Sequence, residues 1–190
     1  MQLGGMKMMI VGLTVAGGIA VSSGVMWQAS SAAFTAQTGN GANGWEAGTV
    51  ALSDDDSGTA MFAATNLRPG STGEKCITLT YSGSLSASVK MYSSAVSGDL
   101  APYVDLVIEE GAGGDSSSCA GFTSSGTAYT GTLDAFGTAS TDFGSGVGAF
   151  APGGPAETNT YHISYTVNAA APDSVQGASA DATFTWEAAS

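Results

Sequence analysis

The clearest hydrophobic alternation in the chain lies near its C-terminus. Between residues 161 and 167 every second side chain is apolar or aromatic, and the same alternation returns between residues 182 and 186. A period of two predicts half-buried β-strands. The linker between the two runs contains Pro172, Asp173 and Gly177, residue types that favour turns. We therefore expect a strand pair that closes the chain, with Trp186 in the core of a β-sandwich.

Earlier runs of the same kind extend this pattern along the chain. They predict strands at 48–53, around Met61 and Phe62, and at 76–81, 85–92 and 103–108. The sequence NLRPG at 66–70 predicts a turn. The sequence SGS at 82–84 predicts a tight turn that joins its two flanking strands in a hairpin. The segment 133–136 (LDAF) favours a short helical turn, and the fold class expected is all-β.

The first 33 residues have the pattern of a secretory signal peptide. Lys7 is the only charge, a long apolar run follows it, and small residues come next. Cleavage is expected after Ser31, Ala32 or Ala33, which makes a signal peptidase a partner during export. A retained membrane helix is the alternative, but glycines and serines interrupt the run. We expect residues 34–190 to form one domain with no stable membrane anchor after cleavage.

The composition is that of an acidic protein rich in small residues. The formal net charge is −12, and only 11% of the residues are charged, whereas 43% are hydrophobic. A surface this acidic disfavours nucleic acid as a partner, because binding a phosphate backbone requires cationic side chains. The hydrophobic share and its strand period argue against a disordered chain.

The two cysteines, Cys76 and Cys119, predict one disulfide, since their number is even and export permits oxidation. Such a bridge closes a loop worth about 3–4 kcal/mol in the chain-entropy model. Two buried free thiols are the alternative. A metal site is not expected, because two cysteines and the distant His162 do not form an obvious ligand set. No cofactor is expected either.

Two acidic clusters have a functional and a structural interpretation. Asp54, Asp55 and Asp56 resemble part of a calcium loop, but no Gly and Glu follow at EF-hand spacing, so a solvated turn is the simpler interpretation. Glu109 and Glu110 end the 103–108 run. Neighbouring residues of a strand point to opposite faces, so these two carboxyl groups are not expected to converge on a substrate. We expect both to be solvated.

Three segments of the chain together resemble the TasA/camelysin family of secreted Gram-positive matrix proteins. The leader runs directly into AFTAQTGN, which is similar to the family's aromatic segment at the cleavage site. The stretch 66–92 is similar to its NLxPG turn and the strands that follow. The stretch 174–188 (SVQGASADATFTWEA) is similar to its closing strand. The chain departs from the family at Tyr81, where an Asn is usual, and in its cysteine pair.

The resemblance implies a jelly-roll-like antiparallel β-sandwich and a structural role in the biofilm matrix. It implies filaments in which the N-terminal segment of one subunit adds as a strand to the sheet of the next. A candidate donor strand covers 34–40. Together with the residue before it, the expected subunit contacts are Ala33, Phe34, Thr35, Ala36, Gln37, Thr38 and Gly39. An ordinary N-terminal tail is the alternative.

Camelysins are also described as proteases, so enzyme chemistry has to be considered. The chain has one histidine, His162, and lacks the HExxH zinc motif. A serine triad would need His162 as its base, but this residue alternates with Tyr161 and Ile163 and is expected to point outward. We expect no enzymatic activity. The alternative to a matrix protein is a monomeric secreted binding module for carbohydrate or a surface protein, with Trp45 as its exposed aromatic.

Overall fold

The computed structural model describes residues 47–57 and 60–190. The expected leader, the candidate donor residues and Trp45 lie outside the described residues. The strands are β1 (Leu52–Ser53), β2 (Thr72–Tyr81), β3 (Ser88–Ser97), β4 (Val104–Ala112), β5 (Thr123–Thr132), β6 (Glu157–Val167) and β7 (Asp181–Ala189). The helices are η1 (Ala101–Tyr103), α1 (Leu133–Ala139) and η2 (Asp173–Val175).

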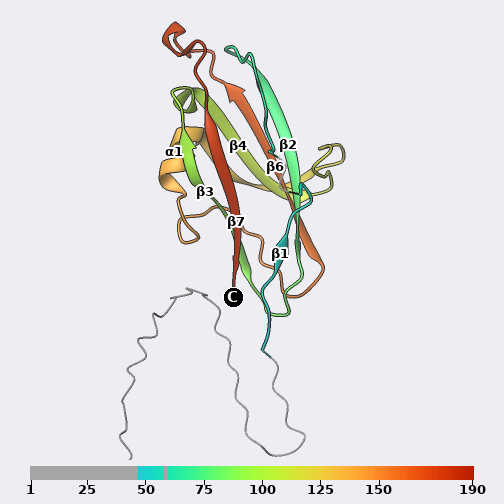
Figure 1. The fold of residues 1–190 in the computed structure, drawn as a ribbon. Helices are drawn as coiled ribbons and strands as arrows, with labels where there is room; N and C mark the ends of the chain where they lie inside the picture. The colour runs from blue at the N-terminus through green and yellow to red at the C-terminus, as the bar shows by residue number, and fades with distance from the viewer. Residues whose placement is uncertain (1–46, 58–59) are drawn as a thin grey trace, which may run out of the picture. The chain divides into compact units, whose positions relative to one another are not determined.

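The strands form two antiparallel sheets that face each other (Figure 1). One sheet has five strands in the order β1-β2-β6-β4-β5, and the other pairs β3 with β7. This confirms an all-β sandwich with one short α-helix. The expected helical turn at 133–136 is also confirmed as the start of α1. Its N-cap is Thr132, whose hydroxyl accepts a hydrogen bond from the amide of Ala135 at 3.2 Å.

The core lies between the sheets and is built from the alternating residues. Ile77 and Leu79 of β2 are 1% exposed, and Ile163 of β6 is fully buried. From the smaller sheet, Val89 and Met91 point into the same layer and are also fully buried. Strands β2, β3, β4 and β6 thus each place one face in the core and the other toward the outside, as the period of two requires.

The predicted strand pairings were wrong, although the predicted strand positions were largely right. The turn at 82–84 does not make a hairpin, because β2 lies in the five-stranded sheet and β3 in the other. The two closing runs are likewise separated, with β6 between β2 and β4 and β7 beside β3. Two strands that each have one apolar face can bury those faces in the same core in either of two ways: side by side in one sheet, or in opposite sheets across the core. Alternation alone does not decide between these two arrangements.

The segment before β2 also differs from the prediction. Only Leu52 and Ser53 of the expected strand 48–53 pair with β2. Met61 and Phe62 lie in irregular chain rather than in a strand, yet both pack against the core. The turn at 66–70 is confirmed: the amide of Ser71 donates to the carbonyl of Arg68 at 2.8 Å.

Candidate functional site

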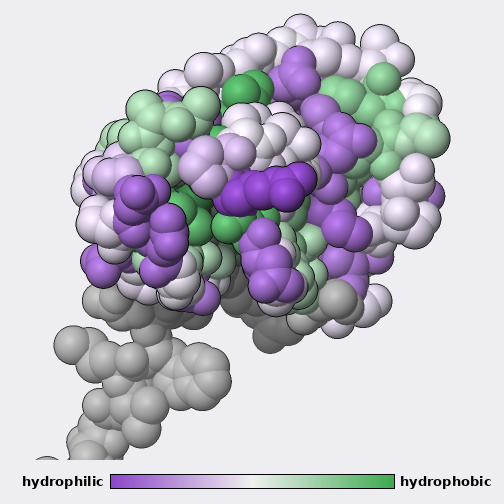
Figure 2. Space-filling model, turned by 90° about the horizontal axis from the view of Figure 1, so that it is seen from above, coloured by the Kyte–Doolittle hydropathy of each residue, from purple (hydrophilic) through white to green (hydrophobic). Residues whose placement is uncertain are grey.

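A groove of about 1630 Å³ runs between the sheets beside β7. The five-stranded sheet contributes Leu79 and Leu106 to its lining, and β7 contributes Phe184 and Trp186. In the view from above, hydrophobic residues are visible between hydrophilic ones on the upper face of the molecule (Figure 2). The irregular segment also lines the groove through Met61, Phe62, Leu67 and Arg68. The hydrophobic layer of the sandwich is therefore open along one side.

Strand β7 borders this groove with an unpaired edge. It pairs with β3 on one side. The register of the two strands contains one bulge, whose extra residue, Ser94, belongs to β3. Along β7 the pairing residues are consecutive from Asp181 to Ala189. Within the described residues, no main-chain hydrogen bond is made to the other side of β7. A continuous row of main-chain donors and acceptors thus faces the groove.

The other edge of β3 is covered by the segment 140–152. Main-chain amides of Val89 and Met91 donate to the carbonyls of Phe150 and Val147, each at 2.8 Å. Glu110 holds this segment in place, since its carboxylate accepts from the amides of Ala149 at 2.7 Å and Phe150 at 3.2 Å. Of the two edges of the small sheet, only that of β7 is left without a main-chain partner among the described residues.

Glu110 is a structural residue that the sequence interpretation missed. Strand β4 continues to Ala112, and Glu110 is 7% exposed rather than solvated. Its third partner is Asn159, whose side-chain amide donates at 3.2 Å. The signal was present in the alternation, because Glu110 follows Leu106 and Ile108 at intervals of two. The prediction that Glu109 and Glu110 lie on opposite faces of the strand is confirmed, since Glu109 contacts His162 and Glu110 contacts the segment 140–152.

Beneath β7, the hydroxyl of Tyr161 and the indole N–H of Trp186 are buried without a partner among the described residues. The two rings meet edge to face, with centroids 5.7 Å apart. Burial, and then the nearby charge of Glu110, raise the pKa of the Tyr161 hydroxyl far above its usual value. Tyr161 therefore stays neutral in the folded protein.

The five-stranded sheet has two further edges, and both are obstructed. In the pairing of β4 with β5, Ser125 and Ala128 are skipped, so β5 carries two bulges within ten residues. At β2, the amide of Thr78 donates to the Asp55 carboxylate at 2.9 Å, and β1 covers the end of the strand. Bulges and charged side chains are the usual means by which proteins block pairing at sheet edges.

Asp55 ties two loops together. Its second carboxylate oxygen accepts from the amide of Ser116 at 2.8 Å, and its carbonyl accepts from the Ser116 hydroxyl at the same distance. Both carboxylate oxygens of Asp55 are thus engaged by main-chain amides. The pKa of the neighbouring Asp54 is raised, first by partial burial and then by a hydrogen bond to Asp56. Calcium at Asp54, Asp55 and Asp56 stays a prediction.

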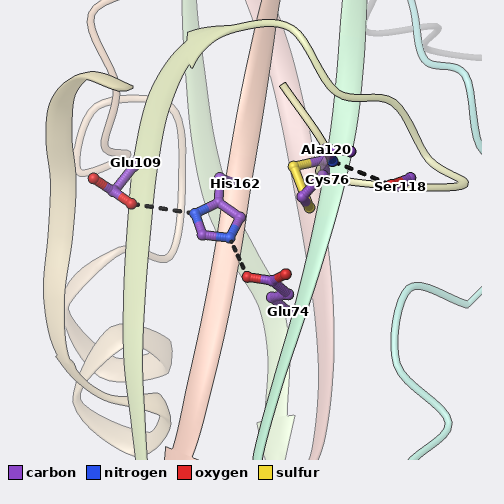
Figure 3. Close-up of polar contacts among 7 residues, drawn as sticks. Glu74, Cys76, Glu109, Ser118, Ala120 and His162 are labelled. Atoms are coloured by element: carbon purple, nitrogen blue, oxygen red, sulfur yellow. Dashed lines mark hydrogen bonds and ion pairs between the residues drawn. A yellow bond between two sulfur atoms is a disulfide. The ribbon is translucent and has the colours of Figure 1, made fainter. Parts of the chain in front are cut away.

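On the outer face of the five-stranded sheet, the predicted disulfide between Cys76 and Cys119 is confirmed (Figure 3). The Cα atoms are 5.3 Å apart, and the bridge joins β2 to the loop between β4 and β5. His162 lies directly opposite Cys76 in the register of β2 and β6. The sulfurs and an imidazole nitrogen lie within 4.8 Å of one another. The histidine that is distant in sequence is therefore close in space, contrary to the expectation.

His162 lies between two carboxylates on neighbouring strands (Figure 3). Its Nε2 is 3.0 Å from Glu74 on β2, and its Nδ1 is 3.2 Å from Glu109 on β4. A hydrogen bond from Ser124, and then one from His162, lower the pKa of Glu109. Within the described residues neither ring nitrogen bonds to a serine hydroxyl, as a serine triad would require.

No helix among the described residues is long and apolar enough to span a membrane. Comparison of the sequence with protein-family models and with curated proteins found no match.

Proposed function

We propose that this protein is a secreted structural subunit of an extracellular biofilm matrix, and that it assembles into filaments by strand addition. Residues 33–39 of one copy pair with the open edge of β7 in the next. The observation that carries the proposal is the groove beside β7, where an unpaired strand edge adjoins an exposed part of the hydrophobic layer. An added strand would satisfy both at once, through main-chain hydrogen bonds and apolar burial.

The composition of the donor segment suits this edge. It carries no charge, and alternation places Phe34, Ala36 and Thr38 on one face. On an added strand that face turns toward Phe184 and Trp186 of β7. Seven extended residues span about 23 Å, which is shorter than the nine residues of β7, so the segment fits along the strand. Phe34, the one large apolar side chain of the segment, is the expected anchor.

The direction of the contact leads to a filament. The donor precedes the described part of the chain, whereas the acceptor is its last strand. Such a head-to-tail contact uses different surfaces on the two copies, so each added copy presents a free acceptor or donor to the next, and the contact repeats as a filament where its rotation does not close. Copies that start at Ala33 lack Lys7 and keep all 16 acidic residues, so their formal charge is −13 and they repel each other. An uncharged donor and an apolar acceptor let such copies associate without bringing further charges together.

Export and family membership belong to the same proposal. The leader-like segment, the disulfide and the TasA/camelysin resemblance support a cell-surface or matrix location in a Gram-positive bacterium. Removal of the leader by a signal peptidase would expose the donor strand. The chain crosses between the sheets from β2 to β3, from β3 to β4 and from β6 to β7. These crossings suit a jelly-roll-like sandwich.

Negative-stain electron microscopy of purified protein tests the proposal. Protein that starts at Ala33 should form filaments, and protein without residues 33–39 should stay monomeric. Phe34→Asp should also prevent filaments, because it places a charge in the apolar groove. Thr35→Asp is the matched control, since the same charge then points away from the groove and filaments should persist.

Monomers from the Ala33 form at high concentration after long incubation would contradict the proposal. They would favour the alternative, a monomeric module that binds carbohydrate or a surface protein. Filaments that survive both the deletion and Phe34→Asp would show self-association through another surface and would equally overturn the role of the donor strand.

A further inference from the structure

Four side chains with metal-binding groups meet on the outer face of the five-stranded sheet, on the opposite side of that sheet from the groove. Glu74 and Cys76 are two residues apart on β2 and so point to the same face. His162 faces Cys76 across the strand pair, and Cys119 arrives on the loop between β4 and β5. In the folded protein, the two sulfurs are joined as a disulfide and unavailable to a metal.

The spacing of these groups is close to that of a tetrahedral zinc site. Zinc–sulfur bonds of about 2.3 Å and zinc–nitrogen bonds of about 2.0 Å place the ligand atoms roughly 3.3–3.8 Å apart. The two sulfurs and the imidazole nitrogen lie within 4.8 Å of one another. The Glu74 oxygen is 3.0 Å from Nε2 of His162. Opening of the disulfide would therefore leave the two sulfurs and the imidazole near coordination distance, with the Glu74 carboxylate beside His162 as the fourth ligand.

We propose that reduction of the Cys76–Cys119 disulfide converts this cluster into a Zn²⁺ site with Cys76, Cys119, His162 and Glu74 as ligands. A dithiol reductant supplies two electrons and two protons to the disulfide and itself becomes a disulfide. Zn²⁺ then displaces the two thiol protons, which are released to solvent. Two thiolates, one imidazole and one carboxylate are a ligand set that suits zinc.

The residues around the cluster include a partner that orients the His162 ring and a cavity through which a reductant can reach the disulfide. When Nε2 of His162 binds the metal, Nδ1 keeps its proton and donates to Glu109, which fixes the ring as outer carboxylates do in zinc sites. The ring of Phe122 covers the imidazole, with centroids 5.0 Å apart. A cavity of about 190 Å³ is lined in part by Lys75, Cys76 and Ser117, and it gives a reductant an approach to the bridge from the Cys76 side.

Cobalt substitution tests the site on the full mature protein. Reduced under anaerobic conditions and freed of reductant, the protein should bind one Co²⁺ with thiolate-to-cobalt charge-transfer absorption and tetrahedral visible bands. Zn²⁺ should displace the cobalt stoichiometrically. The oxidised protein should show neither absorption. Cys119→Ser should weaken the charge-transfer band, His162→Asn should change the visible bands, and Glu109→Gln should weaken binding about 10–100-fold.

Glu187→Gln, an exposed glutamate of β7, is the matched control and should bind cobalt as the wild type does. Absence of the charge-transfer band in reduced, folded protein would overturn the proposal, as would a spectrum that His162→Asn leaves unchanged. If reduction unfolds the chain, Zn²⁺ should restore the circular dichroism of the native protein. Failure to restore it would also overturn the proposal.

Discussion

The edges formed by β5 and β7 are both long and both unpaired among the described residues, yet they differ in what they offer a second chain. Strand β5 has ten residues, mostly exposed, and two bulges break its register with β4. Strand β7 has nine consecutive pairing residues and lies beside an apolar groove. An exposed edge is therefore not sufficient for strand addition, which also needs an unbroken row of main-chain groups and a surface to bury.

The electrostatic surroundings of the two edges differ as well. Near β5, Glu109 bonds to His162 and is stabilised by Ser124, and the disulfide holds the preceding loop. Beneath β7, the aromatic rings of Tyr161 and Trp186 lie in contact with their polar atoms unpaired. The polar groups near β5 are thus paired, whereas the β7 side has exposed apolar surface and buried polar atoms without partners among the described residues.

The largest expected effect on peptide binding comes from placing a charge on each edge in turn. Ala182 on β7 and Thr130 on β5 are both exposed, and Ala182 lies on the groove-lining face of β7 with Phe184 and Trp186. Ala182→Glu would place a carboxylate in the groove against an uncharged donor strand, where its loss of hydration costs about 3 kcal/mol. Binding of a fluorescent peptide of residues 33–39 to donor-deleted protein should weaken on the order of 100-fold in anisotropy titrations. Thr130→Glu should leave binding unchanged, and equal weakening by both would refute the distinction between the edges.

The second effect concerns the disulfide and should act on β5 alone. The Cys76→Ser, Cys119→Ser double variant should lose about 3–4 kcal/mol of unfolding free energy in urea titrations. Because the bridge anchors the loop that leads into β5, amide hydrogen exchange should accelerate in 113–132 more than in β7. Equal acceleration in β7 would show that the disulfide supports the whole sandwich rather than one edge.

The third effect lies beneath β7 and runs in the stabilising direction. Tyr161→Phe removes an unpaired buried hydroxyl and should raise the unfolding free energy by about 1 kcal/mol at neutral pH. Because burial raises the pKa of Tyr161, only the unfolded chain ionises this group as the pH passes about 10, so the wild type loses stability there. The variant should lose less between pH 7 and 10.5.

Tyr103→Phe, at a partly exposed tyrosine of η1, is the control for this measurement and should not raise the unfolding free energy at neutral pH, because it removes no unpaired buried hydroxyl. A Tyr161→Phe protein that is less stable than the wild type would mean that the hydroxyl has a partner, such as a bound water, that stabilises it.

The sequence predicted the features of the two edges that depend on neighbouring residues, but not those that depend on contacts between distant parts of the chain. Alternation located most strands and the buried side of each, because side-chain direction is a local property of the backbone. The alternation also predicts that Glu110 points inward, because it follows Leu106 and Ile108 at intervals of two. Its charge favoured the opposite interpretation, a side chain in solvent. An even cysteine count and a leader-like segment were enough to predict the Cys76–Cys119 bridge.

Strand order was not visible, and the functional features depend on it. The proximity of His162 to Cys76 exists because β6 lies beside β2 with those residues in register. The open edge of β7 exists because, within 47–57 and 60–190, β3 is the one strand beside it. Neither neighbour is adjacent in sequence, and no local pattern distinguishes a strand that pairs from one that faces across the core. The groove residues Met61 and Phe62 showed the apolar signal of a strand without its geometry.

The smallest expected effect is the acid sensitivity of the β5 side. The pKa of Glu109 is lowered in the folded protein, first by Ser124 and then by His162, so its carboxylate stabilises the fold above the unfolded pKa of about 4.3. That stability is lost as the pH falls through the lower folded pKa. Glu109→Gln should therefore reduce the difference in unfolding free energy between pH 6 and pH 3, by less than about 1 kcal/mol because the group is partly solvated. Peptide binding at β7 should not change, and a Glu109→Gln protein with weakened peptide binding would show that the two edges are coupled through β4 and β6.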